Sequence, residues 1–216
     1  MDGMLIVNNL AGLLIVTSLL VICANRVATA AWLYVLQSLT LVGVFLALAI
    51  AQGSHELTLW AASAFVTKVV LAPLILIKLL GPLPDDPALK GLLGPAWMAV
   101  LAALIVLVSW YAVDAVRLAV VAQLKPALAV SLGHFLLGLA CIVTSGNILK
   151  QIFGYCLMEN GAHLTLALMA GKAPEVVEIG IATDAVCAVL IMALLARRIH
   201  RTLQTLDVRQ LTALKG

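Results

Sequence analysis

Long apolar runs follow one another along almost the whole chain, separated by short polar breaks. Each run is close to the roughly 20 residues that an α-helix needs to cross about 30 Å of hydrocarbon. The breaks contain glycine, proline, asparagine and charged residues, which commonly end helices. The pattern predicts seven transmembrane helices, over residues 4–24, 30–51, 57–80, 95–113, 127–145, 148–170 and 176–196.

One stretch does not fit this pattern simply. Asp114, Arg117 and Lys125 interrupt an otherwise apolar run between residues 114 and 125. This stretch could extend the helix over 95–113, or it could lie along the membrane interface. The hydrophobic pattern leaves both conformations open.

The composition indicates that lipid is the solvent for these runs. Hydrophobic residues make up 64% of the 216 residues and charged residues 11%, whereas soluble domains have about 45–50% apolar and 25% charged residues. A water-soluble fold is excluded, and the charges do not imply a nucleic-acid-binding surface. The predicted fold class is all-α, a polytopic membrane protein of about seven transmembrane helices, with loops too short for an extramembrane domain.

The cysteines do not suggest a metal or redox centre. Cys23, Cys141, Cys156 and Cys187 all lie inside apolar segments, with no CxxC pair and no spacing typical of metal ligands. Free cysteines of this kind usually serve in packing. We therefore expect no bound cofactor and no metal site in this chain.

Basic residues are distributed unevenly between the breaks. With the N-terminus outside, seven crossings place nine Lys and Arg residues in the cytoplasm and three outside, and cytoplasmic loops are the ones enriched in these residues. The count predicts an outside N-terminus and a cytoplasmic C-terminus. The cytoplasmic set is Arg26, Lys78, Lys90, Lys150, Arg197, Arg198, Arg201, Arg209 and Lys215, and the outer set is Arg117, Lys125 and Lys172.

Several ionisable side chains fall well inside the predicted helices. A Lys or Asp at the centre of a membrane helix costs about 2.5–3.5 kcal/mol on insertion scales, so such residues face a bundle interior or a water cavity and need a partner. Desolvation brings buried carboxyls and amines closer to exchanging protons near neutral pH. We predict a proton relay near mid-membrane that is formed by Glu159, Asp184, Lys68, His134 and His163.

Glu159 is the leading candidate for the relay. It shares one face of its helix with His163, at i and i+4, and with Cys156 one turn earlier. The alternative is an interhelical hydrogen bond that only holds the bundle together, which is common in membranes.

The other candidates also have structural alternatives. Lys68 lies five residues before Pro73, which should loosen the backbone near the charge, but it could serve only in an ion pair with a carboxylate of another helix. His134 could carry protons, or it could be a neutral, hydrogen-bonded packing residue. Asp184 is expected near mid-depth of the last helix.

Short motifs in the second half of the chain resemble known families. The segments LLGL (136–139), NIL (147–149) and IFGYCLMENGA (152–162) resemble the small NuoK-type membrane subunit of complex I, and with the last helix this resemblance covers about the final ninety residues. Over its whole length, including the closing LTALKG (211–216), the chain is similar to the hydrogenase-4 component E family. That family belongs to formate hydrogenlyase-type complexes.

The resemblance transfers only part of the NuoK-type pattern. Those subunits carry one glutamate in each of their last two helices; Asp184 falls on the second position, but Cys156 falls on the first, and Glu159 comes one turn later. Because i and i+3 share a face, the charge moves about 4.5 Å along the helix axis. The proton relay of the NuoK-type subunits is therefore either retained, with Glu159 in place of the first glutamate, or interrupted at this position. The outside N-terminus of the NuoK-type helices agrees with the charge count.

The resemblance implies a domain organisation and a function. It implies an N-terminal four-helix membrane region over 1–125, a NuoK-like three-helix region over 126–200 and a cytoplasmic tail over 201–216. The chain is expected to be a membrane-arm subunit of an oxidoreductase complex, not catalytic by itself. It would contribute, through buried carboxylates, to proton (or sodium) translocation coupled to hydrogen evolution.

The implied partners are antiporter-like membrane subunits and a soluble nickel–iron hydrogenase arm, in the bacterial inner membrane. Two alternatives come from other classes. A structural scaffold would use the same charges as interhelical ties without conducting ions. A stand-alone secondary transporter would need two related halves around a midplane site, and the sequence shows no such halves.

Overall fold

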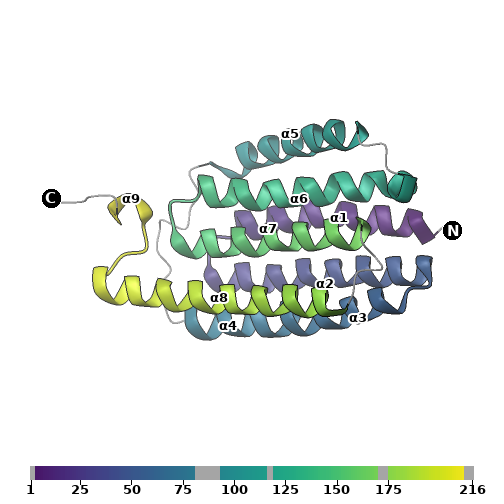
Figure 1. Cartoon of the computed structure of the whole chain (residues 1–216). Helices are drawn as coiled ribbons and strands as arrows, with labels where there is room; N and C mark the ends of the chain where they lie inside the picture. The colour runs from purple at the N-terminus through teal and green to yellow at the C-terminus, as the bar shows by residue number, and fades with distance from the viewer. Residues whose placement is uncertain (1–2, 81–92, 116–118, 170–174, 212–216) are drawn as a thin grey trace.

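The computed structural model describes residues 3–80, 93–115, 119–169 and 175–211. Its long helices lie side by side and alternate in direction (Figure 1). A helix with an irregular middle is built from α3 (His55–Ala64), η1 (Phe65–Leu71) and α4 (Ala72–Leu80). The other long helices are α1 (Gly3–Cys23), α2 (Val27–Gln52), α5 (Pro95–Asp114), α6 (Lys125–Thr144), α7 (Ile148–Met169) and α8 (Glu175–Leu203), and the short ones are η3 (Ala119–Leu124) and α9 (Val208–Leu211).

The predicted all-helical membrane fold is confirmed. Six helical stretches of the described chain are long and apolar enough to cross a membrane: Gly3–Cys23, Val27–Gln52, His55–Leu80, Pro95–Asp114, Ala122–Thr144 and Ile179–Leu203. The seventh predicted crossing is α7, which has 22 residues and runs beside the others (Figure 1). It is less apolar because its sequence includes Lys150, Gln151, Glu159, Asn160 and His163.

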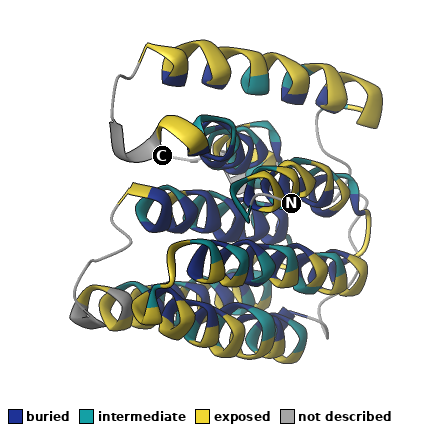
Figure 2. Cartoon of the chain, turned by 90° about the vertical axis from the view of Figure 1, so that its right-hand side faces the viewer, coloured by how far each residue is buried: buried dark blue, intermediate teal, exposed yellow. Residues whose placement is uncertain are grey.

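The outward faces of the helices are largely apolar. Figure 2 shows the buried residues turned toward the middle of the bundle and the exposed ones turned outward. Ile50 and Val143 are 83% and 73% exposed in the isolated chain, which is favourable in lipid but not in water.

The helix over 57–80 is irregular where Pro73 was expected to loosen it. Residues Phe65–Leu71 form a π-helix, and the backbone N–H of Ala72 bonds the carbonyl of Thr67, five residues back. A proline has no N–H to donate and its ring crowds the preceding turn, and π-helical hydrogen bonding within an α-helix is one of the identifiable forms of helix irregularity. The irregular segment contains Lys68, which is buried.

The stretch 114–125 does not extend α5 as one continuous helix. α5 ends at Asp114, and Ala119–Leu124 forms a 3-10 helix before α6 begins at Lys125. The ammonium of Lys125 lies 3.3 Å from Oδ1 of Asp114 and 3.1 Å from its backbone oxygen. This contact closes the connection between the two helices.

α6 and α7 pack closely because three glycines lie at their crossing. A Cβ on Gly138 would lie 2.6 Å from the carbonyl oxygen of Gly154, and one on Gly161 would lie 2.8 Å from Cα of Phe135. Small residues allow backbones to approach in this way in membrane bundles. The close approach holds the polar residues of α7 at a fixed distance from α6.

Adding a methyl group at this crossing should loosen the bundle. We expect Gly138→Ala to destabilise the protein by about 1–3 kcal/mol, because the obstructing atoms are backbone and cannot turn away. The measurement is the unfolding midpoint of the purified chain in mixed detergent micelles, followed by circular dichroism. Gly43→Ala is the matched control, since a Cβ there meets nothing within 4 Å; an equal loss in both variants would contradict the packing argument.

The end of the chain returns to the turn between α6 and α7. The N–H of Val208 donates to the oxygen of Gly146 at 2.8 Å, and the N–H of Ile148 donates to the oxygen of Leu206 at 3.1 Å. Leu206 is buried beneath this contact. Hydrogen bonds from Arg209 hold the pKa of Asp207 below its ordinary value. Part of the predicted tail, 201–216, is therefore packed against the bundle.

Candidate functional site

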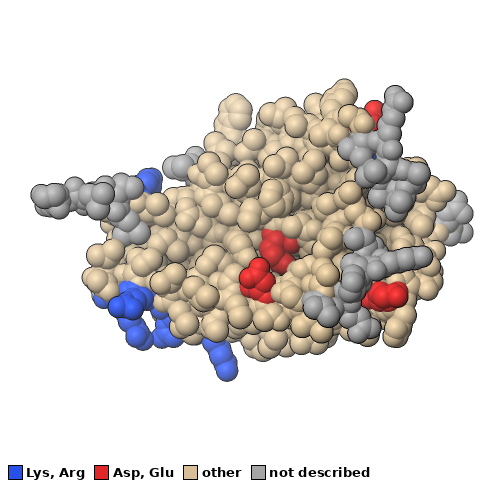
Figure 3. All heavy atoms as spheres, in the orientation of Figure 1, with Lys and Arg blue, Asp and Glu red and all other residues tan. Residues whose placement is uncertain are grey.

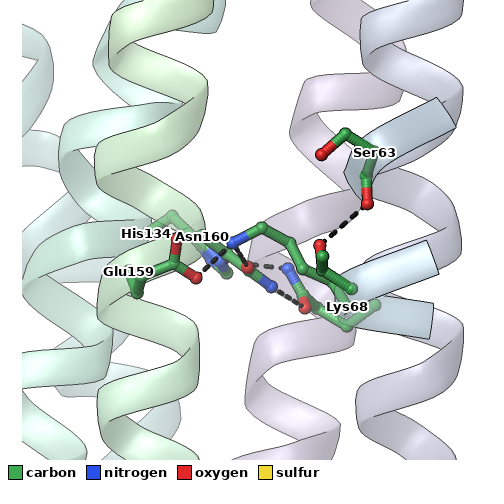
Figure 4. Close-up of polar contacts among 7 residues, drawn as sticks. Ser63, Lys68, His134, Glu159 and Asn160 are labelled. Atoms are coloured by element: carbon green, nitrogen blue, oxygen red, sulfur yellow. Dashed lines mark hydrogen bonds and ion pairs between the residues drawn. The ribbon is translucent and has the colours of Figure 1, made fainter. Parts of the chain in front are cut away.

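Lys68 is a buried cation at the centre of the bundle. Its ammonium forms an ion pair with Oε2 of Glu159 on α7 and donates a hydrogen bond to Oδ1 of Asn160 at 2.8 Å. Figure 4 shows Lys68 pointing from its own helix toward these two residues. The side chains of Lys68 and Glu159 are only 2% and 16% exposed. Each charge therefore meets the requirement for a partner within the membrane.

The hydrogen bonds continue from Asn160 across three more helices. Nδ2 of Asn160 donates to Oε1 of Gln37 on α2 at 2.8 Å. Nε2 of Gln37 lies 3.1 Å from Nε2 of His134 on α6. Nδ1 of His134 lies 2.7 Å from the hydroxyl of Ser18 on α1. One unbroken polar chain thus connects Glu159 to Ser18, and we refer to these six residues, Glu159, Lys68, Asn160, Gln37, His134 and Ser18, as the polar chain.

The polar chain divides the hydrophobic core into two parts. The buried apolar residues form two hydrophobic clusters. On each helix that contributes a fully buried residue to the polar chain, the apolar residues before and after that residue belong to different clusters. On α1, for example, Leu14 and Val21 flank Ser18, and on α2, Tyr34 and Leu41 flank Gln37. A polar layer of this kind is stable only because its members satisfy one another.

Glu159 lies at the outer edge of this layer, in a groove between α7 and α8. The groove has a volume of about 290 Å³ and is lined by Glu159, Ala162, His163, Leu166, Ile181, Asp184 and Ala185. Figure 3 shows acidic side chains near the middle of this face, and Lys and Arg side chains gathered at one end. The groove makes the Glu159 end of the ion pair accessible from the side of the bundle.

The sequence suggested that Asp184 points into the bundle. In the structure this residue is instead exposed on α8. The buried side of α8 is a stripe of small residues, Ala182, Ala185, Val189, Ala193 and Ala196. Position 184 lies off this stripe at 100° per residue. Within the described residues, Asp184 has no hydrogen-bond or ion-pair partner. The two carboxylates therefore share a groove, but only Glu159 is paired within the chain.

The two histidines have different surroundings. His134 is a fully buried member of the polar chain. His163 lies on the groove, with its ring 4.9 Å from that of Phe45 and 5.4 Å from that of Trp60, measured between centroids. The shared face predicted for Glu159 and His163 agrees with their common position on the groove.

Sequence reasoning missed two members of the polar chain, Gln37 and Ser18. It considered only ionisable side chains, and both of these residues are uncharged. The sequence did contain an indication of Gln37, because its side-chain amide lies in the middle of an apolar run. A buried amide also needs hydrogen-bond partners. Asn160 had been noted only as part of the segment over 152–162.

The part of the chain that the structure describes contains no group of three or more His, Cys, Asp or Glu side chains that could hold a metal ion. Its four cysteines are free. What the polar chain offers chemically is a set of proton donors and acceptors, with one carboxylate and one amine in direct contact.

Comparisons with known proteins support the resemblance seen in the sequence. Residues 126–216 match the family model of NADH-ubiquinone/plastoquinone oxidoreductase chain 4L. The chain is 57% identical to hydrogenase-4 component E of Escherichia coli (strain K12), Escherichia coli O157:H7 and Shigella flexneri, over 100% of both chains in each case. No solved structure matches the chain. The identity over the full length shows that this chain belongs to the hydrogenase-4 component E family.

Proposed function

We propose that this protein is a non-catalytic membrane-arm subunit of a hydrogenase-4-type complex, and that it contributes to proton (or sodium) movement coupled to hydrogen evolution. The assignment to a complex rests on membership of the component E family and on the match to the complex I-type chain. The observation that supports ion movement is the ion pair between Lys68 and Glu159, at the centre of an apolar bundle and open to a groove.

Glu159 is the group that would take up and release the proton. One of its oxygens is bound by Lys68, and the other, Oε1, is buried without a hydrogen-bond partner among the described residues. Protonation of this carboxylate would remove the charge that holds the ammonium of Lys68. The ammonium would then rely on Asn160 or move toward another acceptor, so that proton uptake changes the charge distribution at mid-membrane.

Asp184 supports a proposal about the neighbouring subunit. The groove is lined by two carboxylates, and in the described chain only one of them, Glu159, is paired with a lysine. A carboxylate that faces lipid at mid-depth is unfavourable by about 2.5–3.5 kcal/mol. We propose that a transmembrane helix of another membrane subunit covers this face and presents a basic side chain to Asp184. This helix would also cover His163, which lines the same groove.

The proposed orientation has the N-terminus outside and the C-terminus in the cytoplasm of the bacterial inner membrane. In the described chain, Arg26, Lys78, Lys150 and Arg198 lie at or near helix ends that face one side of the antiparallel bundle. This side is the one that the positive-inside rule places in the cytoplasm.

The test is the number of protons moved per hydrogen molecule in Glu159→Gln. In inverted membrane vesicles, we expect proton movement to fall by roughly tenfold or more with the complex assembled, because an amide cannot take up the proton. Asp114→Asn, which alters an exposed carboxylate, should leave the yield unchanged. A normal proton yield in Glu159→Gln would contradict the proposal, and loss of assembly together with normal yield in the remaining complex would favour the scaffold.

A further inference from the structure

The hydrogen bonds of the polar chain can be assigned a direction. The hydroxyl of Ser18 has one hydrogen, and it donates that hydrogen to the backbone oxygen of Leu14. The same hydroxyl must therefore accept from Nδ1–H of His134, 2.7 Å away. A neutral imidazole with a proton on Nδ1 has an acceptor at Nε2, and the amide nitrogen of Gln37 lies 3.1 Å from that atom.

The hydrogen bonds to the side-chain oxygens of Gln37 and Asn160 run in the same direction. Oε1 of Gln37 accepts from Nδ2 of Asn160 at 2.8 Å, and Oδ1 of Asn160 accepts from the ammonium of Lys68 at 2.8 Å. Every donor in the series points from Lys68 toward Ser18. Turning over either amide would place two donors or two acceptors against each other, so the whole series has one consistent arrangement.

Two carboxamides, those of Gln37 and Asn160, separate the two titratable ends of this series. A carboxamide donates and accepts hydrogen bonds but does not exchange its protons as a carboxyl, an amine or an imidazole does. A proton could cross both amides only by passing through high-energy imidic forms. The side chains of Gln37, Asn160 and His134 are all fully buried in the chain, so bulk solvent does not reach them there.

We infer that the Gln37–Asn160 pair stops proton transfer within the polar chain and holds His134 in the neutral Nδ1–H form. This inference rests on the proposed function, because it concerns which residues carry the proton in it. Glu159 and Lys68 exchange protons on the groove side, whereas His134 and Ser18 complete the hydrogen bonding on the far side. Gln37 is then a positioning residue that keeps the proton at Glu159.

The first test separates Glu159 from His134 in the assembled complex. His134→Gln retains a donor for Ser18 and an acceptor for Gln37 but cannot titrate. We expect its proton yield per hydrogen molecule to stay within about twofold of wild type, while Glu159→Gln loses roughly tenfold. Equal losses in the two variants would overturn the inference and leave the proposed function intact. No loss in Glu159→Gln would instead refute the proposed function.

The second test reads the imidazole directly and does not depend on assembly. The full chain, labelled with ¹⁵N-histidine in lipid nanodiscs, has four histidines, and the signal missing in His134→Gln identifies residue 134. At neutral pH we expect a protonated Nδ1 and a hydrogen-bonded acceptor Nε2. In Gln37→Met, the Nε2 signal should move toward that of a free acceptor. A protonated Nε2 in the wild-type chain, or no change in Gln37→Met, would overturn the inference.

Discussion

Replacing Lys68 with methionine is expected to destabilise the chain by about 3–5 kcal/mol, because the substitution leaves the carboxylate of Glu159 buried without its counter-ion. Proton movement per hydrogen molecule should also fall, by roughly tenfold or more, because the proposed exchange at Glu159 depends on the ammonium of Lys68 beside it. Stability is measured on the purified chain in mixed micelles, and proton yield in inverted vesicles.

A double variant distinguishes the ion pair from other effects at this position. Adding Glu159→Gln to Lys68→Met removes the unpaired charge, so most of the lost stability should return while proton movement does not. Lys78→Met is the matched control, because Lys78 lies on the same composite helix but is exposed. The ion-pair interpretation is wrong if the double variant is as unstable as Lys68→Met, or if Lys78→Met is equally damaging.

Reversing the charge of Asp184 is expected to weaken association with the neighbouring membrane subunit by roughly tenfold or more, because like charges at an interface cost several kcal/mol. The amount of complex recovered with an affinity-tagged Asp184→Lys chain measures this effect. Asp184→Asn removes the charge without reversing it, so its loss should be smaller.

The same experiment shows whether the exposed face of α8 is covered. Ile191→Lys serves as a control, because it places a lysine on an exposed position of the same helix. Normal recovery of the complex with Asp184→Lys would mean that no basic side chain faces this carboxylate. A full loss in Asp184→Lys together with normal folding of the free chain would support the proposed neighbour.

The membrane fold could be predicted from the sequence because its causes are local. A run of apolar residues must cross lipid as a helix whatever its neighbours are, since the backbone has no other way to bond its polar groups there. The same local reasoning identified Lys68, Glu159 and His134 as residues in need of partners, and it anticipated the irregular backbone before Pro73.

Tertiary structure alone decided which of these residues meet. Lys68 and Glu159 are 91 positions apart, and their contact depends on how each helix is rotated about its axis, which hydropathy does not specify. The rotation of α8 about its own axis likewise places Asp184 on the outside. The packing of the stripe of small residues determined which side of α8 is buried.

By itself, the sequence determined that this protein is a helical membrane bundle with several ionisable groups in the hydrocarbon region, because the length and polarity of each run carry that information. The tertiary structure decided that Gln37, Asn160 and Ser18 join Lys68 and His134 into one directed polar chain. Uncharged amides and hydroxyls acquire such a role only when several helices bring their donors and acceptors within hydrogen-bonding distance.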